Sequence, residues 1–358
     1  MKGSIKNQIN LDIEGILKEN LPWHKLNGAR ILITGANGFV GQYLLRTLLR
    51  LNQIEKLEEP LQVIAMVRDK EKSGENFSDI QFDKFIKIIE WDLNKILSIP
   101  KQNIDFIFHL ASKASPKFYK SDPVGTILPN TVGTAALLEL LSNSNSKKTS
   151  KGLVFVSSSE VYGESIFNLN QKSLTEDIDF IVNPKSNHYC YSESKRLGEA
   201  LCRSWTKQYG IPTYSARLFH TYGPGLNRND GRVFADFIFN ILNNENVKIL
   251  GSGKTKRSFC YVSDSIKALL TILLKGEASE SYNIGDPNAE LSIFNLAKLL
   301  VDIYPEKNLT VIFENKEINL LKNEFNVLKP NIDKLKNLGW YPRVQPIRGF
   351  KQTIDCHF

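Results

Sequence analysis

The stretch Arg30-Ile-Leu-Ile-Thr-Gly35-Ala-Asn-Gly38-Phe-Val-Gly41 decides the fold. Its first five residues are mostly apolar and predict a buried strand. The glycines permit a tight turn, and residues 40–51 then have the periodicity of a helix. Such a turn lets backbone N–H groups approach a pyrophosphate, which the helix N-terminus also favours. The stretch therefore predicts a dinucleotide-binding strand, turn and helix.

Strand and helix patterns alternate through the next part of the chain. Apolar runs predict further strands at 62–67, 85–90, 105–110, 152–156 and 213–216. This alternation predicts a Rossmann-like α/β fold, in which a doubly wound parallel sheet has right-handed crossovers. From residue 219 the pattern loosens into short strands and helices, including helices at 233–243 and 293–303.

These patterns divide the chain into three parts. Residues 1–28 have apolar side chains at helical spacing and are expected to form an N-terminal helical extension packed on the main body. Residues 29–218 are expected to form the NAD(P)-binding Rossmann domain. Residues 219–358 are expected to form mostly a smaller mixed α/β substrate-binding lobe, with 282–284 returning to the sheet.

Composition limits the class of protein. A chain of 358 residues that is 42% hydrophobic and 23% charged can bury a large core, which excludes disorder as its main state. The apolar runs are too short to span a bilayer and the amino terminus lacks a signal-peptide pattern, so we expect a cytoplasmic protein without a membrane partner. Four cysteines without C-x-x-C spacing indicate neither a metal site nor disulfides. The net charge of +8 comes from scattered lysines and favours a solvated surface over nucleic-acid binding.

The end of the second predicted strand bears on cofactor choice. At this place an acidic residue binds the ribose hydroxyl of NAD, whereas an arginine accommodates the 2′-phosphate of NADP. Arg68 occupies the earlier position and favours NADP, while Asp69, one residue later, could still serve NAD. A solvated charge pair is the plain structural alternative. Asp92, after the third predicted strand, is a candidate to contact the adenine amine.

Tyr191-Ser-Glu-Ser-Lys195 on a predicted helix is the strongest catalytic signal. Residues four apart share a helix face, so both side chains can point into one cleft. A nearby ammonium favours the phenolate of a tyrosine, whose ordinary pKa is near ~10. Tyr191 could then accept a hydroxyl proton as a hydride leaves carbon, while Lys195 also holds the cofactor ribose. The pair alone is common by chance, but together with the glycine loop and the upstream run Ser157-Ser-Ser-Glu160 it predicts an oxidoreductase.

Together these motifs resemble the extended short-chain dehydrogenase/reductase family, the NAD-dependent epimerases and dehydratases of nucleotide sugars, over about residues 30–341. Within that family the chain is most similar to the UDP-glucuronate decarboxylases. The matching segments are His109-Leu-Ala-Ser-Lys-Ala-Ser-Pro116, Tyr119, Pro123, Asn130-Thr-Val-Gly-Thr134, Ser159-Glu160-Val-Tyr-Gly163, Cys190-Tyr191, Lys195-Arg196, Asn229-Asp-Gly-Arg-Val233 and Gly251-Ser-Gly-Lys-Thr-Lys-Arg257.

The resemblance implies a role for each matching residue. Catalysis would fall to Tyr191, Lys195, Ser158, Ser159 and Glu160, with a serine bonded to the sugar O4 and Glu160 acting on the oxidised sugar. The substrate, a nucleotide diphosphate sugar, would be bound by Tyr119, Asn130, His220, Arg232 and Arg257, the arginines chiefly through the diphosphate. The cofactor would be NAD, or NADP because of Arg68, and no metal is implied. Besides Tyr191 and Lys195, the cofactor contacts would be Gly35, Asn37, Gly38, Phe39, Val40, Gly41, Arg68, Asp92, Leu93, Leu110, Ala111 and Ser112.

Several positions depart from the decarboxylase pattern. Leu328 stands where an arginine near the substrate carboxylate is usual, and His220 replaces an asparagine. Ser192 and Ser194 replace Asp and Gly beside the catalytic pair. Decarboxylation, dehydration and 4-epimerisation share C4 oxidation with the hydride held on the cofactor, so the sequence leaves the late step open and favours decarboxylation.

Two other functions remain open, those of a reductase and of a redox-sensing scaffold. A reductase that consumes NADPH to reduce a nucleotide-linked ketose would explain Arg68. A redox-sensing scaffold would be expected to lack the tyrosine or the lysine, and both are present.

The helical stretches 126–141 and 191–209 are apolar on more faces than one sheet needs, which predicts a homodimer built on a four-helix contact. Burial of these faces under the amino-terminal segment is the alternative.

Overall fold

A seven-stranded parallel sheet forms the centre of the computed structural model, which describes residues 3–54, 56–95, 103–144, 151–163, 173–178, 189–314 and 329–358. The strand order is β11-β7-β5-β4-β1-β2-β3. Because the order reverses between β1 and β4, loops diverge there at the carboxyl edge and leave a crevice suited to a ligand. The predicted doubly wound sheet is confirmed. Its strands are β1 (Arg30–Thr34), β2 (Gln62–Val67), β3 (Ile86–Glu90), β4 (Phe106–His109), β5 (Gly152–Ser158), β7 (Thr213–Leu218) and β11 (Ser281–Ile284).

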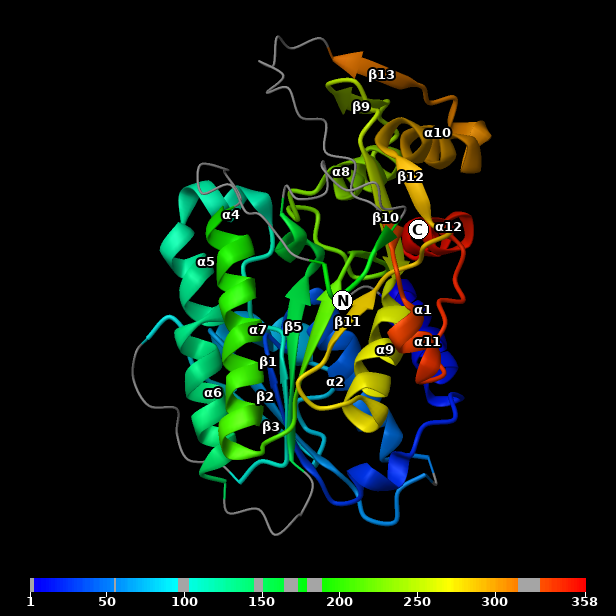
Figure 1. Ribbon diagram of the computed structural model, residues 1–358. Helices are drawn as coiled ribbons and strands as arrows, with labels where there is room; N and C mark the ends of the chain where they lie inside the picture. Colours follow the sequence, from blue (N-terminus) through cyan, green and yellow to red (C-terminus); the bar gives the residue numbers. More distant parts are fainter. Residues whose placement is uncertain are drawn as a thin grey trace.

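Helices cover both faces of this sheet (Figure 1). One face carries α4 (Pro116–Ser121), α5 (Pro123–Asn130), α6 (Val132–Ser142) and α7 (Tyr189–Tyr209). The other carries α1 (Gly3–Leu17), α2 (Phe39–Leu51) and α9 (Val262–Lys275), while α3 (Lys70–Phe77) lies beside β3. Helices on both faces explain why Ile31, Leu32 and Ile33 of the central strand β1 are all fully buried.

Two strands run further toward the site than their apolar patterns predict. The expected strands end at residues 156 and 216, whereas β5 continues to Ser158 and β7 to Leu218. In the register of the sheet, Ser157 pairs with Arg217 and Ser158 with Leu218. The extension carries two serines to the carboxyl edge on a rigid strand instead of a loop.

The predicted helical stretch 126–141 is helical in the structure except at Thr131. The structure has two helices, α5 and α6, separated at Thr131 with φ −116° and ψ −81°. Pro129 lies inside α5 and has no N–H to donate to the preceding turn, which weakens the helix there. The combined stretch Pro123–Ser142 is long and apolar enough to cross a membrane, but 61% of its most apolar window is buried in the protein, as in a core helix.

A smaller lobe stands above the carboxyl edge of the sheet (Figure 1). A three-stranded sheet and a parallel pair of strands form its framework. The strands are β8 (His220–Tyr222), β10 (Lys256–Tyr261), β12 (Glu290–Ser292), β9 (Val247–Leu250) and β13 (Val311–Glu314). The helices are α8 (Val233–Leu242), α10 (Ile293–Ile303), α11 (Asp333–Asn337) and α12 (Pro346–Asp355). A short pair, β6 (Ser173–Leu174) and β14 (Lys329–Pro330), lies nearby, and the 3-10 turns are Trp23–Leu26, Ser159–Tyr162 and Pro305–Lys307.

The amino-terminal helix α1 is part of the core. Its apolar face packs against α2 and α9. The Asp12 carboxylate accepts hydrogen bonds from the hydroxyls of Tyr43, in α2, at 3.0 Å and of Tyr261, in β10, at 2.9 Å. Burial raises the pKa of Asp12, and the two hydroxyls oppose that rise. The helix thereby ties the large sheet to the smaller lobe.

Candidate active site

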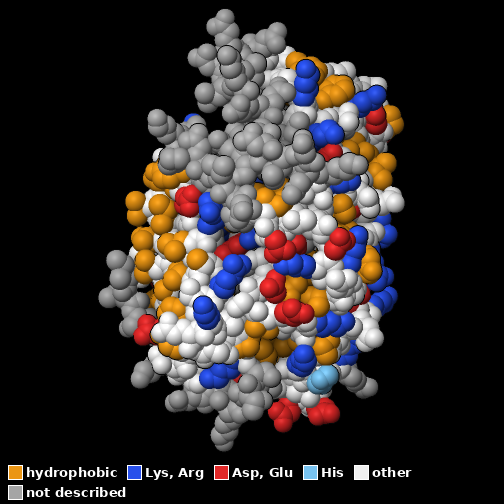
Figure 2. All heavy atoms as spheres, in the orientation of Figure 1, with side chains coloured by type: hydrophobic (Ala, Val, Ile, Leu, Met, Phe, Trp, Pro, Cys, Tyr) orange, Lys and Arg blue, Asp and Glu red, His pale blue; other side chains and the backbone are white. Residues whose placement is uncertain are grey.

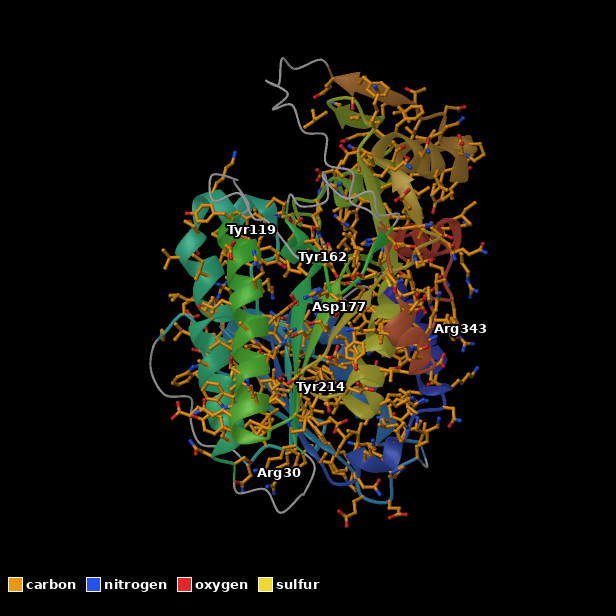
Figure 3. The ribbon with its side chains drawn as sticks, viewed as in Figure 1. Arg30, Tyr119, Tyr162, Asp177, Tyr214 and Arg343 are labelled. Carbon is orange, nitrogen blue, oxygen red and sulfur yellow. The ribbon has the colours of Figure 1, made fainter. Side chains whose placement is uncertain are left out.

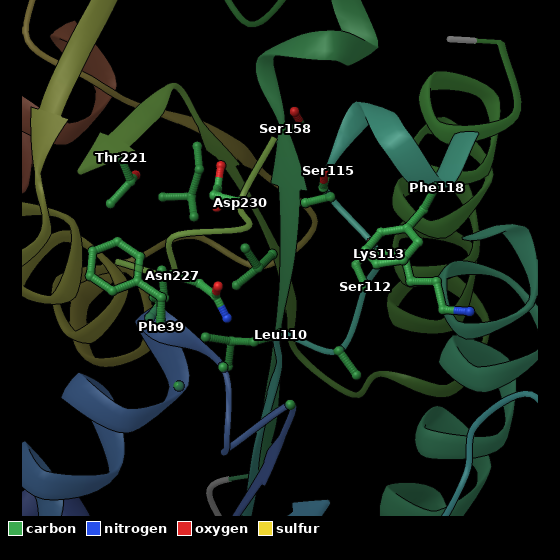
Figure 4. Close-up of a pocket in the computed structure, with 18 of the residues that line it drawn as sticks. Phe39, Leu110, Ser112, Lys113, Ser115, Phe118, Ser158, Thr221, Asn227 and Asp230 are labelled. Atoms are coloured by element: carbon green, nitrogen blue, oxygen red, sulfur yellow. The ribbon is translucent and has the colours of Figure 1, made fainter. Parts of the chain in front are cut away.

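A cavity of about 980 Å³ opens at the carboxyl edge of the large sheet and continues against the smaller lobe. Figure 3 shows Arg30, which begins β1, near the bottom of the molecule, and Tyr119 and Tyr162 well above it, below the smaller lobe. Figure 4 shows Phe39, Leu110 and Asn227 on one side of the cavity and Lys113 and Phe118 on the other. The volume lies at the upper end of the roughly 300–1,000 Å³ of ligand pockets.

The glycine loop forms one wall of the cavity, and its glycines present backbone atoms there because they have no side chains. Gly35 has φ +66°, and a Cβ there would lie 2.9 Å from the Ala111 backbone. A Cβ on Gly41 would lie 2.3 Å from the Gly35 carbonyl oxygen. Only glycine therefore permits this close turn at the start of α2.

His109 fixes the loop that faces the glycine turn. Its Nε2 lies 2.9 Å from the Pro129 carbonyl, which can only accept, so this nitrogen carries the proton. Its Nδ1 then accepts from the Thr34 hydroxyl at 2.7 Å, and the same oxygen accepts the Ala111 N–H at 3.1 Å. Burial lowers the pKa of His109 to about 3, so the ring stays neutral. This chain of bonds sets the position of residues 110–112.

Tyr191 and Lys195 project from α7 into the same cavity. Burial raises the pKa of Tyr191 to about 12, while a hydrogen bond with the Ser158 side chain lowers it. Burial also lowers the pKa of Lys195 to about 7, and Glu199 one turn away opposes this. Lys195 is 2% exposed, and its Nζ donates to the Val156 carbonyl at 2.6 Å and lies 5.7 Å from the Tyr191 ring centroid. The pair is therefore placed for proton handling beside β5.

Ser158, Ser159 and Glu160 follow one another at the end of β5 and all line the cavity. The Ser158 hydroxyl caps a 3-10 turn by accepting the Glu160 N–H at 3.2 Å. Glu160 is near enough to Tyr191 to raise the pKa of its hydroxyl. The Glu160 carboxyl group thus lies beside Tyr191 in one wall of the cavity.

Tyr119 stacks on Tyr191, with ring centroids 4.9 Å apart and planes inclined by 15°. Its hydroxyl donates to the Ala114 carbonyl at 3.0 Å, and burial raises its pKa strongly. Burial therefore favours the neutral form of the Tyr119 hydroxyl, and the ring of Tyr119 supports the ring of Tyr191.

The wall contributed by the smaller lobe is cationic. Arg232 and Arg257 line the cavity, and Arg232 pairs with Asp230. Burial, with a further contribution from both arginines, lowers the pKa of His220 well below its ordinary value. The neutral ring bonds the Ser258 backbone, and its buried Nδ1 has no partner among the described residues. This wall offers two guanidinium groups and one unused acceptor.

Of the other residues predicted from the sequence, Asn130 is the one that the structure places outside the cavity wall. Its side chain is fully buried, and its amide donates to the Thr126 carbonyl and the Ser194 hydroxyl, both at 3.0 Å. Asn130 therefore bonds α5 to α7 behind Tyr191. All the remaining predicted residues line the cavity, and Leu328 lies outside the described residues.

Two further sets of residues were not singled out from the sequence. Lys113 and Asn227 line the cavity, and Lys113 pairs with Asp122 across the start of α5. Lys113 could have been identified from the sequence as a candidate site residue, because it lies in the matching segment His109–Pro116. Behind α7, Glu199 and Arg217 form a buried two-bond pair at 2.9 and 2.7 Å. No local pattern marks that pair, because its partners lie on different elements.

Comparison with known proteins bears directly on this site. Residues 31–285 match the NAD dependent epimerase/dehydratase family. The chain belongs to this family. It is 35% identical over 325 residues to UDP-glucuronic acid decarboxylase 6 of Arabidopsis thaliana, covering 88% of this chain and 85% of that protein. It is 34% identical over 329 residues to UDP-glucuronic acid decarboxylase 1 of Xenopus tropicalis, covering 91% and 71%.

Solved structures of the epimerase/dehydratase family share the fold. UDP-glucuronic acid 4-epimerase from Bacillus cereus, in complex with UDP-glucuronic acid and NAD, has a TM-score of 0.70 and 25% identity, covering 91% of this chain and 98% of that one. DesIV, a dTDP-glucose 4,6-dehydratase from Streptomyces venezuelae with NAD bound, has a TM-score of 0.74 and 22% identity, covering 92% and 96%. The resemblance read from the sequence is confirmed.

The residues of this epimerase/dehydratase fit the dinucleotide on which the family depends. The Gly35 and Gly41 cradle admits a pyrophosphate where a Cβ would collide. Two hydroxyls in the cavity wall, those of Ser112 and Ser157, are buried without partners among the described residues and can bond a ligand. When bound, the nicotinamide takes up and returns a hydride.

Proposed function

We propose that this protein oxidises the sugar of a nucleotide diphosphate sugar at C4 with a recycled nicotinamide cofactor and then completes a second step on the ketone. One observation carries the proposal. Tyr191, Lys195 and Glu160 share a wall of one cavity, which two arginines of the smaller lobe also line. Tyr191, Lys195 and Glu160 together support proton transfer at a sugar hydroxyl, and the two arginines can donate paired hydrogen bonds to a diphosphate.

In this proposal Tyr191 accepts the proton of the sugar O4 hydroxyl, and Ser158 or Ser159 holds that oxygen. The Ser158 bond to Tyr191 supports the arrangement, because it brings the two hydroxyl groups together. Lys195 holds the cofactor ribose and, when protonated, stabilises the phenolate form of Tyr191. Arg232 and Arg257 bind the diphosphate, Tyr119 supports the ring of Tyr191, and His220 accepts a hydrogen bond from the substrate.

The second step is proposed to be decarboxylation, with dehydration and epimerisation as its alternatives. Glu160 supports a step beyond simple oxidation, because a carboxylate beside the reacting sugar can move a second proton. The named relatives with about one third identity are decarboxylases. All three second steps start from the same C4 ketone, so they share the residues described above.

A reductase that consumes NADPH is the second candidate, and Arg68 is the observation that favours it. Arg68 lines the cavity at the end of β2, where a guanidinium suits the extra phosphate of NADP. The same Tyr191 and Lys195 would then deliver a proton to a nucleotide-linked ketose.

The proposed assembly is a cytoplasmic homodimer joined through α5, α6 and α7. Large apolar side chains are exposed on these helices, and Figure 2 shows hydrophobic atoms gathered over this side of the molecule. The exposed residues are Val124, Val132, Tyr189, Leu197 and Tyr209. A cluster of this kind supports burial against a second copy. Light scattering at micromolar concentration tests it, and a monomeric mass would contradict it.

The deciding experiment is anaerobic incubation of the purified protein with a panel of nucleotide sugars and both nicotinamide cofactors. Reduced nicotinamide is followed by absorbance while the product mass is measured. Loss of carbon dioxide or water, or an isobaric product, without net change in the cofactor would support the recycling enzyme and name its second step. Steady consumption of NADPH with a ketose would transfer the assignment to the reductase. The Tyr191→Phe variant is the inactive control for each reaction.

A further inference from the structure

The end of β2 carries a cation where NAD-binding Rossmann folds carry a carboxylate. β2 ends at Val67, and Arg68 follows directly. A carboxylate at this place accepts the hydrogen of the ribose 2′-hydroxyl, whereas a guanidinium has only donors. Arg68 therefore provides hydrogen-bond donors at this end of the cavity, where a carboxylate would provide acceptors.

The carboxylates of Asp69, which lines the cavity beside Arg68, and of Glu90 are both bonded to the first turn of α3. Asp69 accepts the Lys72 N–H at 3.0 Å as the cap of α3 and pairs with the Lys72 ammonium at 3.1 Å. Glu90, the last residue of β3, accepts the Lys70 N–H at 3.0 Å. These bonds hold both carboxylates at the first turn of the helix, because releasing either would leave a helix N–H without its partner.

Arg68 itself remains available to a ligand. Its side chain is exposed and lines the cavity, and within the described ranges no hydrogen bond or ion pair joins its guanidinium to another residue. Its charge still reaches the Asp122 carboxylate, whose pKa it helps to lower. Lys72 also lines the cavity, but its ammonium pairs with Asp69. The Arg68 guanidinium is therefore the group at this strand end that can donate two hydrogen bonds to a phosphate.

We propose that the adenosine end of the cofactor site binds a ribose 2′-phosphate through Arg68, so that this protein takes NADP in preference to NAD. The inference rests on the dinucleotide site of the proposed function and is independent of the reaction that follows. It would set this chain apart from the NAD-bound structural neighbours named above.

Calorimetric titration of the full-length, nucleotide-free protein with NADP⁺ and with NAD⁺ tests the proposal. We expect NADP⁺ to bind about tenfold or more tightly than NAD⁺, which is the effect of one charge-assisted hydrogen bond. Arg68→Gln should weaken NADP⁺ binding by about 10- to 100-fold and change NAD⁺ binding by less than about threefold. Arg68→Asp should reverse the preference, since it restores a carboxylate at the strand end.

Lys70→Gln is the matched control. It removes the same charge two residues away, from a side chain that is exposed and does not line the cavity. The ratio of the two dissociation constants should stay within about twofold of the wild type, because solvent screens an exposed charge that does not line the cavity. Tighter binding of NAD⁺ than of NADP⁺ by the wild type, or an equal effect of both glutamine variants, would overturn the proposal. Because the titration needs no turnover, a preference for NADP⁺ would support it even if no nucleotide sugar reacted.

Discussion

Replacing Lys195 by methionine should make this protein more stable at neutral pH while removing its activity. Burial lowers the pKa of Lys195 from 10.5 to about 7. A shift of that size corresponds to about 5 kcal/mol of unfolding free energy lost to the buried ammonium. Methionine keeps much of the side-chain volume without the charge, but it leaves the Val156 carbonyl without its 2.6 Å partner, which costs about 1–3 kcal/mol. We therefore expect Lys195→Met to be about 2–4 kcal/mol more stable below pH ~7.

The sign of the pH dependence follows from proton binding. Between pH 7 and pH 10.5 the unfolded chain binds the lysine proton and the folded chain does not, so the unfolding free energy of the wild type should rise with pH by about 1.4 kcal/mol per unit from this group. Lys195→Met lacks this contribution, and its advantage should disappear by about pH 9.5.

Urea unfolding of wild type and variant at about pH 6.5 and about pH 9.5 measures both quantities. Lys207→Met is the control, because it makes the same change at an exposed position of the same helix α7. It should shift stability by less than about 0.5 kcal/mol at either pH. The reasoning would be refuted if the difference between wild type and Lys195→Met did not change with pH, or if the wild type were the more stable at about pH 6.5.

Three further changes test other parts of the site. Tyr191→Phe should lower turnover by about 10²- to 10⁴-fold while calorimetric affinity for the cofactor stays within about threefold, and a smaller loss would assign the proton to another group. Arg257→Met should weaken binding of uridine diphosphate by about 10- to 100-fold, whereas Arg50→Met, at an exposed position outside the cavity, should not; equal effects would argue against a diphosphate contact. Glu199→Gln leaves the buried Arg217 without its carboxylate and should lower stability by about 3–5 kcal/mol in urea unfolding, while the double change of both residues to methionine should recover most of that loss. A cost below about 1 kcal/mol for the single change would show that Arg217 finds another partner.

Local sequence was sufficient wherever one element carries the chemistry. The glycines after β1 give the turn because only glycine tolerates the positive φ and the close backbone contacts seen at Gly35. The spacing of Tyr191 and Lys195 puts them on one helix face, since helical periodicity depends on residues close in sequence. The fold class followed in the same way from alternating strand and helix periods.

Local sequence was insufficient where side chains compete for partners from distant elements. The pattern around Asn130 resembles a substrate-binding segment, yet its amide nitrogen donates to the Thr126 carbonyl and the Ser194 hydroxyl in the packing of α5 on α7. The break at Thr131 was hidden by an apolar run that continues through Pro129. Residue spacing predicts neither the bonding of Asn130 nor the break at Thr131, because each depends on which surfaces pack together in three dimensions.

The sequence by itself determined the parallel α/β sheet, the dinucleotide turn and the Tyr191 and Lys195 pair, because these follow from backbone preferences and from the 3.6-residue period of a helix. Only the tertiary structure decided the chemical state of the site. It buries Lys195 and thereby lowers the pKa of its ammonium. It places Arg68 and Asp69 side by side in the cavity wall while Asp69 also caps α3, and it brings Arg257 from the smaller lobe to the same cavity as Glu160. Burial and electrostatic interaction depend on distances between residues far apart in the chain, and folding alone sets those distances.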